Sequence, residues 1–197
     1  MINLIDYLKT HPKKYIIFDL DETLAKLKID WSTYQKELWE LVKTFDNEII
    51  HQIPCQSGMG IKLSNLAIKK HGNKAKSMLD GFTERYEVQH YSGYIAHKEL
   101  LAFIRLYQNK YIYFIWTSNM KKTIQDFLYK EHLHDFFQKI ITRSDVSLLK
   151  PEPDGFAQIY IPDSLLSDYL FIGDNARTDK AAAQKAGIDF FQIDHSF

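Results

Sequence analysis

Five short apolar segments recur along the chain, and segments with helical spacing of apolar residues separate most of them. The apolar segments are continuous rather than alternating, which is typical of strands covered on both faces in a parallel sheet. They span residues 14–20, 111–116, 139–142, 169–172 and 189–193. Helical spacing predicts helices over residues 3–10, 97–108, 121–137, 153–160 and 178–186, the last capped by Thr178 and ended by Gly187. Strands that alternate with helices predict right-handed crossovers and an α/β fold with a parallel sheet.

The pattern changes between residues 26 and 91, where no strand-like run occurs. Apolar residues at helical spacing predict three helices there, over residues 31–45, 61–70 and 74–88. A break rich in glycine and serine falls near residues 54–60. We therefore expect an α/β core domain, made of residues 1–25 and 92–197, and an inserted all-helical domain, made of residues 26–91.

Composition and charge narrow the classes of partner. The chain has 197 residues, and Lys+Arg and Asp+Glu both number 25, so the formal net charge of zero gives no sign of a nucleic-acid-binding surface. Its apolar runs, such as residues 111–116, are too short to span a bilayer. The single cysteine, Cys55, fits a reducing compartment, and the first residues lack the pattern of a signal peptide. We expect a soluble cytoplasmic protein without a membrane or nucleic-acid partner, and its oligomeric state is not predicted.

Two acidic residues follow the first predicted strand. Asp19 and Asp21 are two residues apart, so their side chains point the same way if the chain stays extended. Two carboxylates that converge repel each other unless a cation lies between them. The spacing therefore predicts a divalent metal ion together with nucleophile or acid chemistry at the end of this strand.

Other predicted strands also end in polar residues. In an open parallel sheet, ligands bind beyond the carboxyl ends of the strands, so polar residues at several strand ends predict one shared site. The residues at these positions are Thr117, Ser118 and Asn119 after the second strand, Lys150 in the loop after the third, and Asp174 and Asn175 after the fourth.

Four segments, in this order, resemble the motifs of the haloacid dehalogenase-like hydrolases, most of which are phosphatases. They read DLDETL at 19–24, TSN at 117–119, KPEPDGF at 150–156 and GDNARTDKAAAQKAG at 173–187. The helical insertion lies between the first and second motifs, where the subfamily I branch, which includes phosphoglycolate phosphatase-like proteins, carries a helical cap. The resemblance implies a Rossmann-like, doubly wound parallel sheet of order 3-2-1-4-5. In one departure, Glu22 stands where glycine is frequent in the family.

The resemblance also implies a chemical role for each acidic residue. Asp19 would be the nucleophile that forms an aspartyl-phosphate. Asp21 would act as general acid and then as general base, and its main-chain carbonyl would bind a metal ion. The carboxylates of Asp19 and Asp174 would complete the protein ligands of Mg²⁺. Asn175 and Asp179 would support the site, with Asp179 holding Lys150 or a metal-bound water.

The remaining motif residues would bind the phosphoryl group. Thr117 would contact it through its hydroxyl, together with the main-chain amides of Ser118 and Asn119. Lys150 would neutralise charge on the phosphoryl oxygens and on Asp19. Thr117 and Ser118 also suit a purely structural role as helix caps, and Asp179 suits the N-terminus of a helix.

The implied reaction is Mg²⁺-dependent hydrolysis of a phosphate monoester, with a small phosphorylated metabolite as substrate because the cap encloses a small cavity. Asp21 favours phosphoryl transfer, since the dehalogenases of the family do not need this acid. Two alternatives stay open: a sugar phosphomutase or phosphotransferase of the same fold, and a non-catalytic binding module that retains the fold. The intact set of Asp19, Asp21, Lys150 and Asp174 argues against the second. The loop over residues 56–60 is a candidate to face the site.

Overall fold

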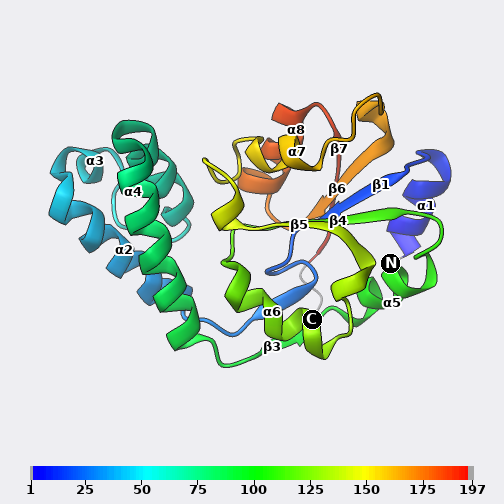
Figure 1. Cartoon of the computed structure of the whole chain (residues 1–197), viewed down its shortest axis with the longest axis horizontal. Coiled ribbons are helices and arrows are strands. Elements are labelled where there is room, and N and C mark those ends of the chain that lie inside the picture. The colour runs from blue at the N-terminus through cyan, green and yellow to red at the C-terminus, as the bar shows by residue number, and fades with distance from the viewer. Residues whose placement is uncertain (1, 195–197) are drawn as a thin grey trace.

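The computed structural model describes residues 2–194 (Figure 1). Within this range, five parallel strands form the central sheet in the order β5-β4-β1-β6-β7. Counted along the chain within this sheet, the order is 3-2-1-4-5, which confirms the predicted topology. The strands are β1 (Tyr15–Phe18), β4 (Ile112–Trp116), β5 (Phe137–Ile141), β6 (Tyr169–Gly173) and β7 (Asp189–Gln192).

The three central strands end at the same level of the sheet. Phe18 of β1 pairs with Ile115 of β4 on one side and with Ile172 of β6 on the other. The residues that follow these strands therefore meet at one edge. Strands β1 and β6 are buried along their whole length, so their side chains pack in the core on both faces of the sheet, as the continuous apolar runs predict.

Helices cover both faces of the sheet. Alternate residues of β1 point to opposite sides, so Ile16 and Phe18 join one hydrophobic cluster while Ile17 joins the other. The first cluster includes residues of α1 (Ile2–Thr10), α5 (Lys98–Leu106) and α6 (Lys121–Lys130). The second includes residues of α7 (Asp154–Ile159) and α8 (Ala181–Ala186). The result is a three-layer α/β arrangement.

The helices between β2 and β3 form a hydrophobic cluster of their own. They are α2 (Trp31–Phe45), α3 (Asn47–Gln52) and α4 (Gly60–His90), and they lie beside the sheet in Figure 1. Gly72 interrupts α4 with φ 62° and ψ −145°, where the sequence predicts a break between two helices. The short helix α3 was not predicted. Although α4 has 31 residues, no helix within residues 2–194 is long and apolar enough to cross a membrane.

A second sheet, not predicted from the sequence, joins the two connections to these helices. Strand β2 (Ala25–Leu27) pairs antiparallel with β3 (Tyr94–Ala96). Residues 26 and 27, assigned to the all-helical insertion, are therefore in a strand. Three residues are too few to show a strand period in the sequence, and pairing depends on a partner that lies far along the chain.

Two predicted helix boundaries are wrong. The helix predicted over residues 121–137 ends at Lys130, His132 has φ 53°, and a 3₁₀ turn η1 (His134–Phe136) leads into β5.

Asn175 rather than Thr178 is the cap after β6, because its side chain accepts a hydrogen bond from the N–H of Arg177 at the start of a π-helical turn, η4 (Ala176–Lys180). Gly187, with φ 74°, ends α8 as predicted. The remaining 3₁₀ turns are η2 (Arg143–Asp145) and η3 (Leu166–Asp168).

Candidate active site

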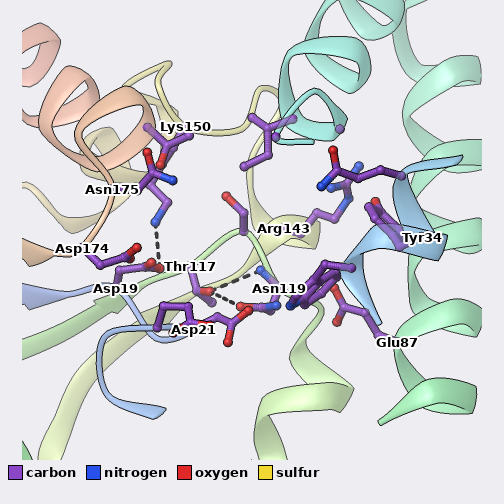
Figure 2. Close-up of a pocket in the computed structure, with 18 of the residues that line it drawn as sticks. Asp19, Asp21, Tyr34, Glu87, Thr117, Asn119, Arg143, Lys150, Asp174 and Asn175 are labelled. Carbon is purple, nitrogen blue, oxygen red and sulfur yellow. Dashed lines mark hydrogen bonds and ion pairs between the residues drawn. The ribbon is translucent and has the colours of Figure 1, made fainter. Parts of the chain in front are cut away.

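A cavity of about 450 Å³ lies at the carboxyl ends of β1, β4 and β6, with α2 and α4 on its far side (Figure 2). All of the predicted site residues line it except Asp179, which lies buried behind Lys150. The lining members are Asp19, Asp21, Thr117, Ser118, Asn119, Lys150, Asp174 and Asn175. Ser57, Gly58 and Gly60, from the loop singled out in the sequence, line the same cavity.

A buried lysine lies between two of the carboxylates. The Nζ atom of Lys150 is 2.7 Å from Oδ1 of Asp19 and 2.7 Å from Oδ1 of Asp179. Burial acts to lower the pKa of Lys150, but the charges of Asp179 and Asp19 outweigh it and raise that pKa above its ordinary value. Burial raises the pKa of Asp19, and Lys150 opposes this effect. Lys150 therefore stays protonated and holds Asp19 in a defined position.

Close packing against β6 places Asp179. A Cβ atom at Gly173 would lie 2.6 Å from Oδ2 of Asp179, so only glycine allows this approach. The same Oδ2 accepts a hydrogen bond from the N–H of Asn175 at 3.1 Å. The π-helical turn after β6 thus turns the Asp179 side chain inward, where it is fully buried and bound to Lys150.

Three carboxylates are close enough to share a cation. Asp19, Asp174 and Asp179 each offer one oxygen, and these oxygens all lie within 4.8 Å of one another. Three carboxylates beside one lysine leave an excess of negative charge. All three offer oxygen atoms, the type of ligand that Mg²⁺ prefers. The residues present therefore fit a divalent cation. The structure adds Asp179 to the carboxylates expected there.

Asp21 turns its carboxylate away from this cluster. Its Oδ1 accepts a hydrogen bond from the N–H of Leu27 at 2.8 Å, across the turn that leads into β2. Burial raises the pKa of Asp21 to about 7, so at neutral pH it can both donate and accept a proton. Glu22, at the position where the family favours glycine, has φ 59°, which explains that preference.

The residues after β4 form a closed turn. The hydroxyl of Thr117 donates to Oδ1 of Asn119 at 2.7 Å and accepts from the N–H of Asn119 at 3.2 Å. The Oγ atom of Ser118 is buried and has no hydrogen-bond partner within the described residues. This turn precedes the N-terminus of α6, where an anion would compete with the Thr117 hydroxyl for the N–H of Asn119.

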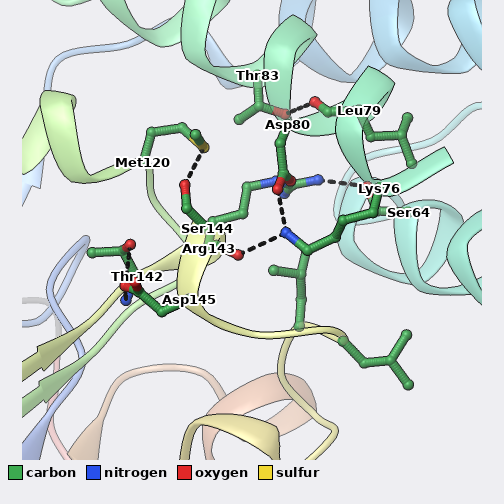
Figure 3. Close-up of polar contacts among 12 residues, drawn as sticks. Ser64, Lys76, Leu79, Asp80, Thr83, Met120, Thr142, Arg143, Ser144 and Asp145 are labelled. Carbon is green, nitrogen blue, oxygen red and sulfur yellow. Dashed lines mark hydrogen bonds and ion pairs between the residues drawn. The ribbon is translucent and has the colours of Figure 1, made fainter. Parts of the chain in front are cut away.

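Sequence reasoning missed Arg143, which follows β5 and reaches across to α4. It is 3% exposed, and it donates from Nε to Asp80 at 2.9 Å and from Nη2 to Ser64 at 3.1 Å (Figure 3). Asp80 also forms an ion pair with Lys76. The position of Arg143 directly after a predicted strand was the signal that could have drawn attention to this residue.

Sequence reasoning also missed Glu87, near the end of α4. It is 1% exposed, lines the cavity, and accepts a hydrogen bond at Oε2 from the N–H of Met120 at 3.0 Å. Burial raises the pKa of Glu87 to about 7, and Thr123, the Met120 amide and Arg143 act against this rise. A glutamate among charged residues of a helix gives no sequence signal of burial. Trp31, Tyr34 and Gln35 of α2 complete the same wall.

The family model of the haloacid dehalogenase-like hydrolases matches residues 16–193. This match spans the sheet, the helices inserted between β2 and β3, and every residue of the cavity. The chain therefore belongs to this family of hydrolases. No curated protein matches the sequence at a significant level.

Solved structures share the fold over most of their length. A HAD hydrolase of Bacillus subtilis bound to magnesium is 18% identical, with 92% of this chain and 86% of that chain covered and a TM-score of 0.54. A HAD phosphatase of Thermococcus onnurineus is 20% identical, with 92% and 86% covered and a TM-score of 0.52. A predicted phosphoglycolate phosphatase of Haemophilus somnus is 19% identical, with 94% and 87% covered and a TM-score of 0.56.

Proposed function

We propose that this protein is a Mg²⁺-dependent phosphatase that hydrolyses a small phosphate monoester through an aspartyl-phosphate. The observation that carries the proposal is the contact of Lys150 with both Asp19 and Asp179, beside Asp174, at the carboxyl edge of the sheet. A carboxylate next to a buried ammonium group and a cation site can attack a phosphoryl group whose negative charge is neutralised on arrival. The relatives named as phosphatases support this proposal.

Asp19 attacks phosphorus in the first half of the reaction. The bond from phosphorus to the leaving oxygen breaks, and Asp21 donates a proton to the departing alcohol. In the second half, Asp21 accepts a proton from water. The water oxygen attacks phosphorus, the bond to Asp19 breaks, and inorganic phosphate leaves. Both carboxylates then return to their starting forms.

The other residues bind and orient the phosphoryl group. The Thr117 hydroxyl and the amides of Ser118 and Asn119 contact its oxygens, which replace the two hydrogen bonds between Thr117 and Asn119, and Lys150 offsets their charge. Asp19, Asp174 and Asp179 would hold Mg²⁺, with Asn175 in support and the main-chain carbonyl of Asp21 as a further ligand. When bound, the ion supplies positive charge that stabilises charge on the transferring group.

Residues 26–91 act as a cap over this site. Residues of α2 and α4 line the side of the cavity opposite the sheet, so they enclose the part of the substrate beyond the phosphoryl group. Closure of such a cap excludes water while the phosphoryl group is on Asp19. The volume of about 450 Å³ suits a small phosphorylated metabolite.

Hydrolysis of p-nitrophenyl phosphate by the full chain, with Mg²⁺ and after chelation, tests the proposal. We expect Mg²⁺-dependent release of inorganic phosphate and its loss in Asp19→Asn. The control is Asp135→Asn, a fully exposed aspartate in η1, which should keep normal activity. A panel of sugar phosphates, followed for isomerised product, distinguishes a phosphomutase. Absence of hydrolysis on the whole panel with Mg²⁺ present would rule the proposal out.

A further inference from the structure

The wall of the cavity opposite Asp19 carries a second buried carboxylate, that of Glu87. This wall, which we call the cap wall, consists of Trp31, Tyr34, Gln35, Glu87 and Arg143. If the protein is the phosphatase proposed above, the phosphoryl group lies beside Asp19 and the alcohol part of the ester extends toward the cap wall. The chemistry of this wall therefore decides which alcohols fit.

Three observations show that Glu87 is held in place and not free to swing into solvent. Its side chain is 1% exposed, and its Oε2 is anchored by the N–H of Met120. Met120 is the N-cap residue of α6 and offers no side-chain cap of its own. The N-terminus of a helix favours a negative group, so this anchor stabilises the carboxylate where it faces the cavity.

The positive charge of the cap wall is largely committed elsewhere. Arg143 donates from Nε to Asp80 and from Nη2 to Ser64, and neither of these partners lines the cavity. Within residues 2–194, Glu87 has no ion-pair partner, and Arg143 acts on it only as a more distant charge. A ligand at this wall therefore meets an acceptor carboxylate, while the neighbouring guanidinium already points toward α4 (Figures 2 and 3).

The cavity as a whole also has more acidic than basic groups. Its lining includes five carboxylate side chains, those of Asp19, Asp21, Glu22, Glu87 and Asp174, against the two cationic side chains of Lys150 and Arg143. A phosphoryl group brings further negative charge. A carboxylate on the alcohol part of the ester would thus lie near Glu87, where Arg143 is already paired with Asp80, and buried like charges repel each other strongly.

We propose that Glu87 determines the substrate class: it selects phosphate monoesters whose alcohol part presents a hydroxyl or ammonium donor and rejects those with a carboxylate. Aromatic side chains of Trp31 and Tyr34 beside it suit the hydrocarbon surface of such an alcohol or its cationic end. This selectivity differs from that of a phosphoglycolate phosphatase, the activity for which one structural relative is named.

Three two-carbon esters of matched size test the proposal: 2-hydroxyethyl phosphate, 2-aminoethyl phosphate and 2-phosphoglycolate. At pH 8, above the Glu87 pKa of about 7, we expect kcat/KM for the first two to exceed that for phosphoglycolate by about tenfold or more. Inhibition of p-nitrophenyl phosphate hydrolysis by each ester reports binding where turnover is slow. Equal values for all three esters, or a preference for phosphoglycolate, would overturn the proposal and would indicate that Arg143 decides instead.

The variant Glu87→Gln assigns the effect to this residue. Glutamine keeps the shape and can still accept from the Met120 amide, so the fold is retained. We expect kcat/KM to rise for phosphoglycolate and to fall for 2-aminoethyl phosphate. The ratio of the two kcat/KM values should therefore shrink by about tenfold. Glu84→Gln, an exposed glutamate three residues earlier on α4, is the matched control and should leave the ratio unchanged. An unchanged ratio in Glu87→Gln would overturn the assignment. If the wild type hydrolyses no ester, p-nitrophenyl phosphate included, the proposed function fails, and this inference fails with it.

Discussion

The ammonium group of Lys150 lies 2.7 Å from Oδ1 of Asp19, and both side chains are buried. A buried ion pair is destabilised strongly when one partner is removed, because the other charge is left without compensation. Lys150 is also the nearest cation to the proposed nucleophile. Its removal should therefore change both stability and activity.

We predict that Lys150→Met lowers kcat for p-nitrophenyl phosphate by about 10²–10³-fold. We also expect a loss of about 3–5 kcal/mol in the free energy of unfolding, measured by urea denaturation. The matched control is Lys185→Met, which breaks the partly exposed pair with Glu152 and should cost at most about 1 kcal/mol. Equal effects of the two substitutions would show that the Lys150 pair contributes nothing special.

The loss of activity on replacing Asp21 should depend on the leaving group of the substrate. An alkyl alcohol needs a proton as it leaves, whereas p-nitrophenolate is stable without one. We expect Asp21→Asn to slow turnover of an alkyl phosphate by about 10²–10⁴-fold. With p-nitrophenyl phosphate the first half of the reaction should survive and the second should slow, which gives a burst of p-nitrophenol in stopped-flow measurements. Equal losses on both substrates, without a burst, would contradict the role given to Asp21.

The pKa of Glu87, raised by burial to about 7, predicts a pH-dependent stability. A carboxyl with a raised folded-state pKa binds its proton more tightly in the folded than in the unfolded protein. Its contribution is therefore fully present below the unfolded pKa near 4.5 and is lost as the pH rises through about 7. The stability of Glu87→Gln relative to wild type should thus increase across this window, by up to about 3 kcal/mol. Thermal unfolding of both proteins from pH 4 to 8 measures this difference, and a constant difference would contradict the prediction.

The close approach of Gly173 to Asp179 predicts that Gly173→Ala is harmful. The new Cβ would lie 2.6 Å from Oδ2 of Asp179, so that carboxylate must move away from Lys150. We expect a drop in kcat of at least about tenfold, because a shift in a supporting carboxylate misplaces the groups bound to it. The free energy of unfolding should fall by about 1–3 kcal/mol, the usual cost of overpacking.

Gly81→Ala is the control for this substitution. Gly81 lies within α4, and a Cβ there would meet only the end of the Arg85 side chain, at 3.5 Å. Alanine at this position should stabilise the protein by about 0.4–1 kcal/mol and leave kcat unchanged. Normal activity of Gly173→Ala would show that Asp179 can move without loss.

The apolar runs that end at Phe18, Trp116 and Gly173 carry enough information to predict the central sheet. A strand buried on both faces must be apolar throughout, so its sequence shows the burial directly. The polar residues after these runs could then be assigned to one edge of the sheet, because parallel strands bring their carboxyl ends together. Eight of the residues that line the candidate site follow from that rule.

Other features depend on contacts between distant segments. Glu87 is buried only because the end of α4 lies against Met120, 33 residues further along the chain. Arg143 reaches Ser64, 79 residues away. The strands β2 and β3 exist because their three-residue segments meet each other. No local pattern reports such meetings, so sequence reasoning placed these residues on helix surfaces or in loops.

The sequence by itself determined the sheet order, the family and the positions of Asp19, Asp21, Thr117, Lys150 and Asp174, since local periodicity and motif spacing encode which residues lie along a strand and which follow it. Only the tertiary structure decided that Asp179 packs on Gly173 and completes the carboxylate cluster, and that Glu87 faces the cavity. The physical reason is that burial of a charged side chain depends on the particular partner that stabilises it. For Asp179 that partner is Lys150, and for Glu87 it is the main-chain amide of Met120.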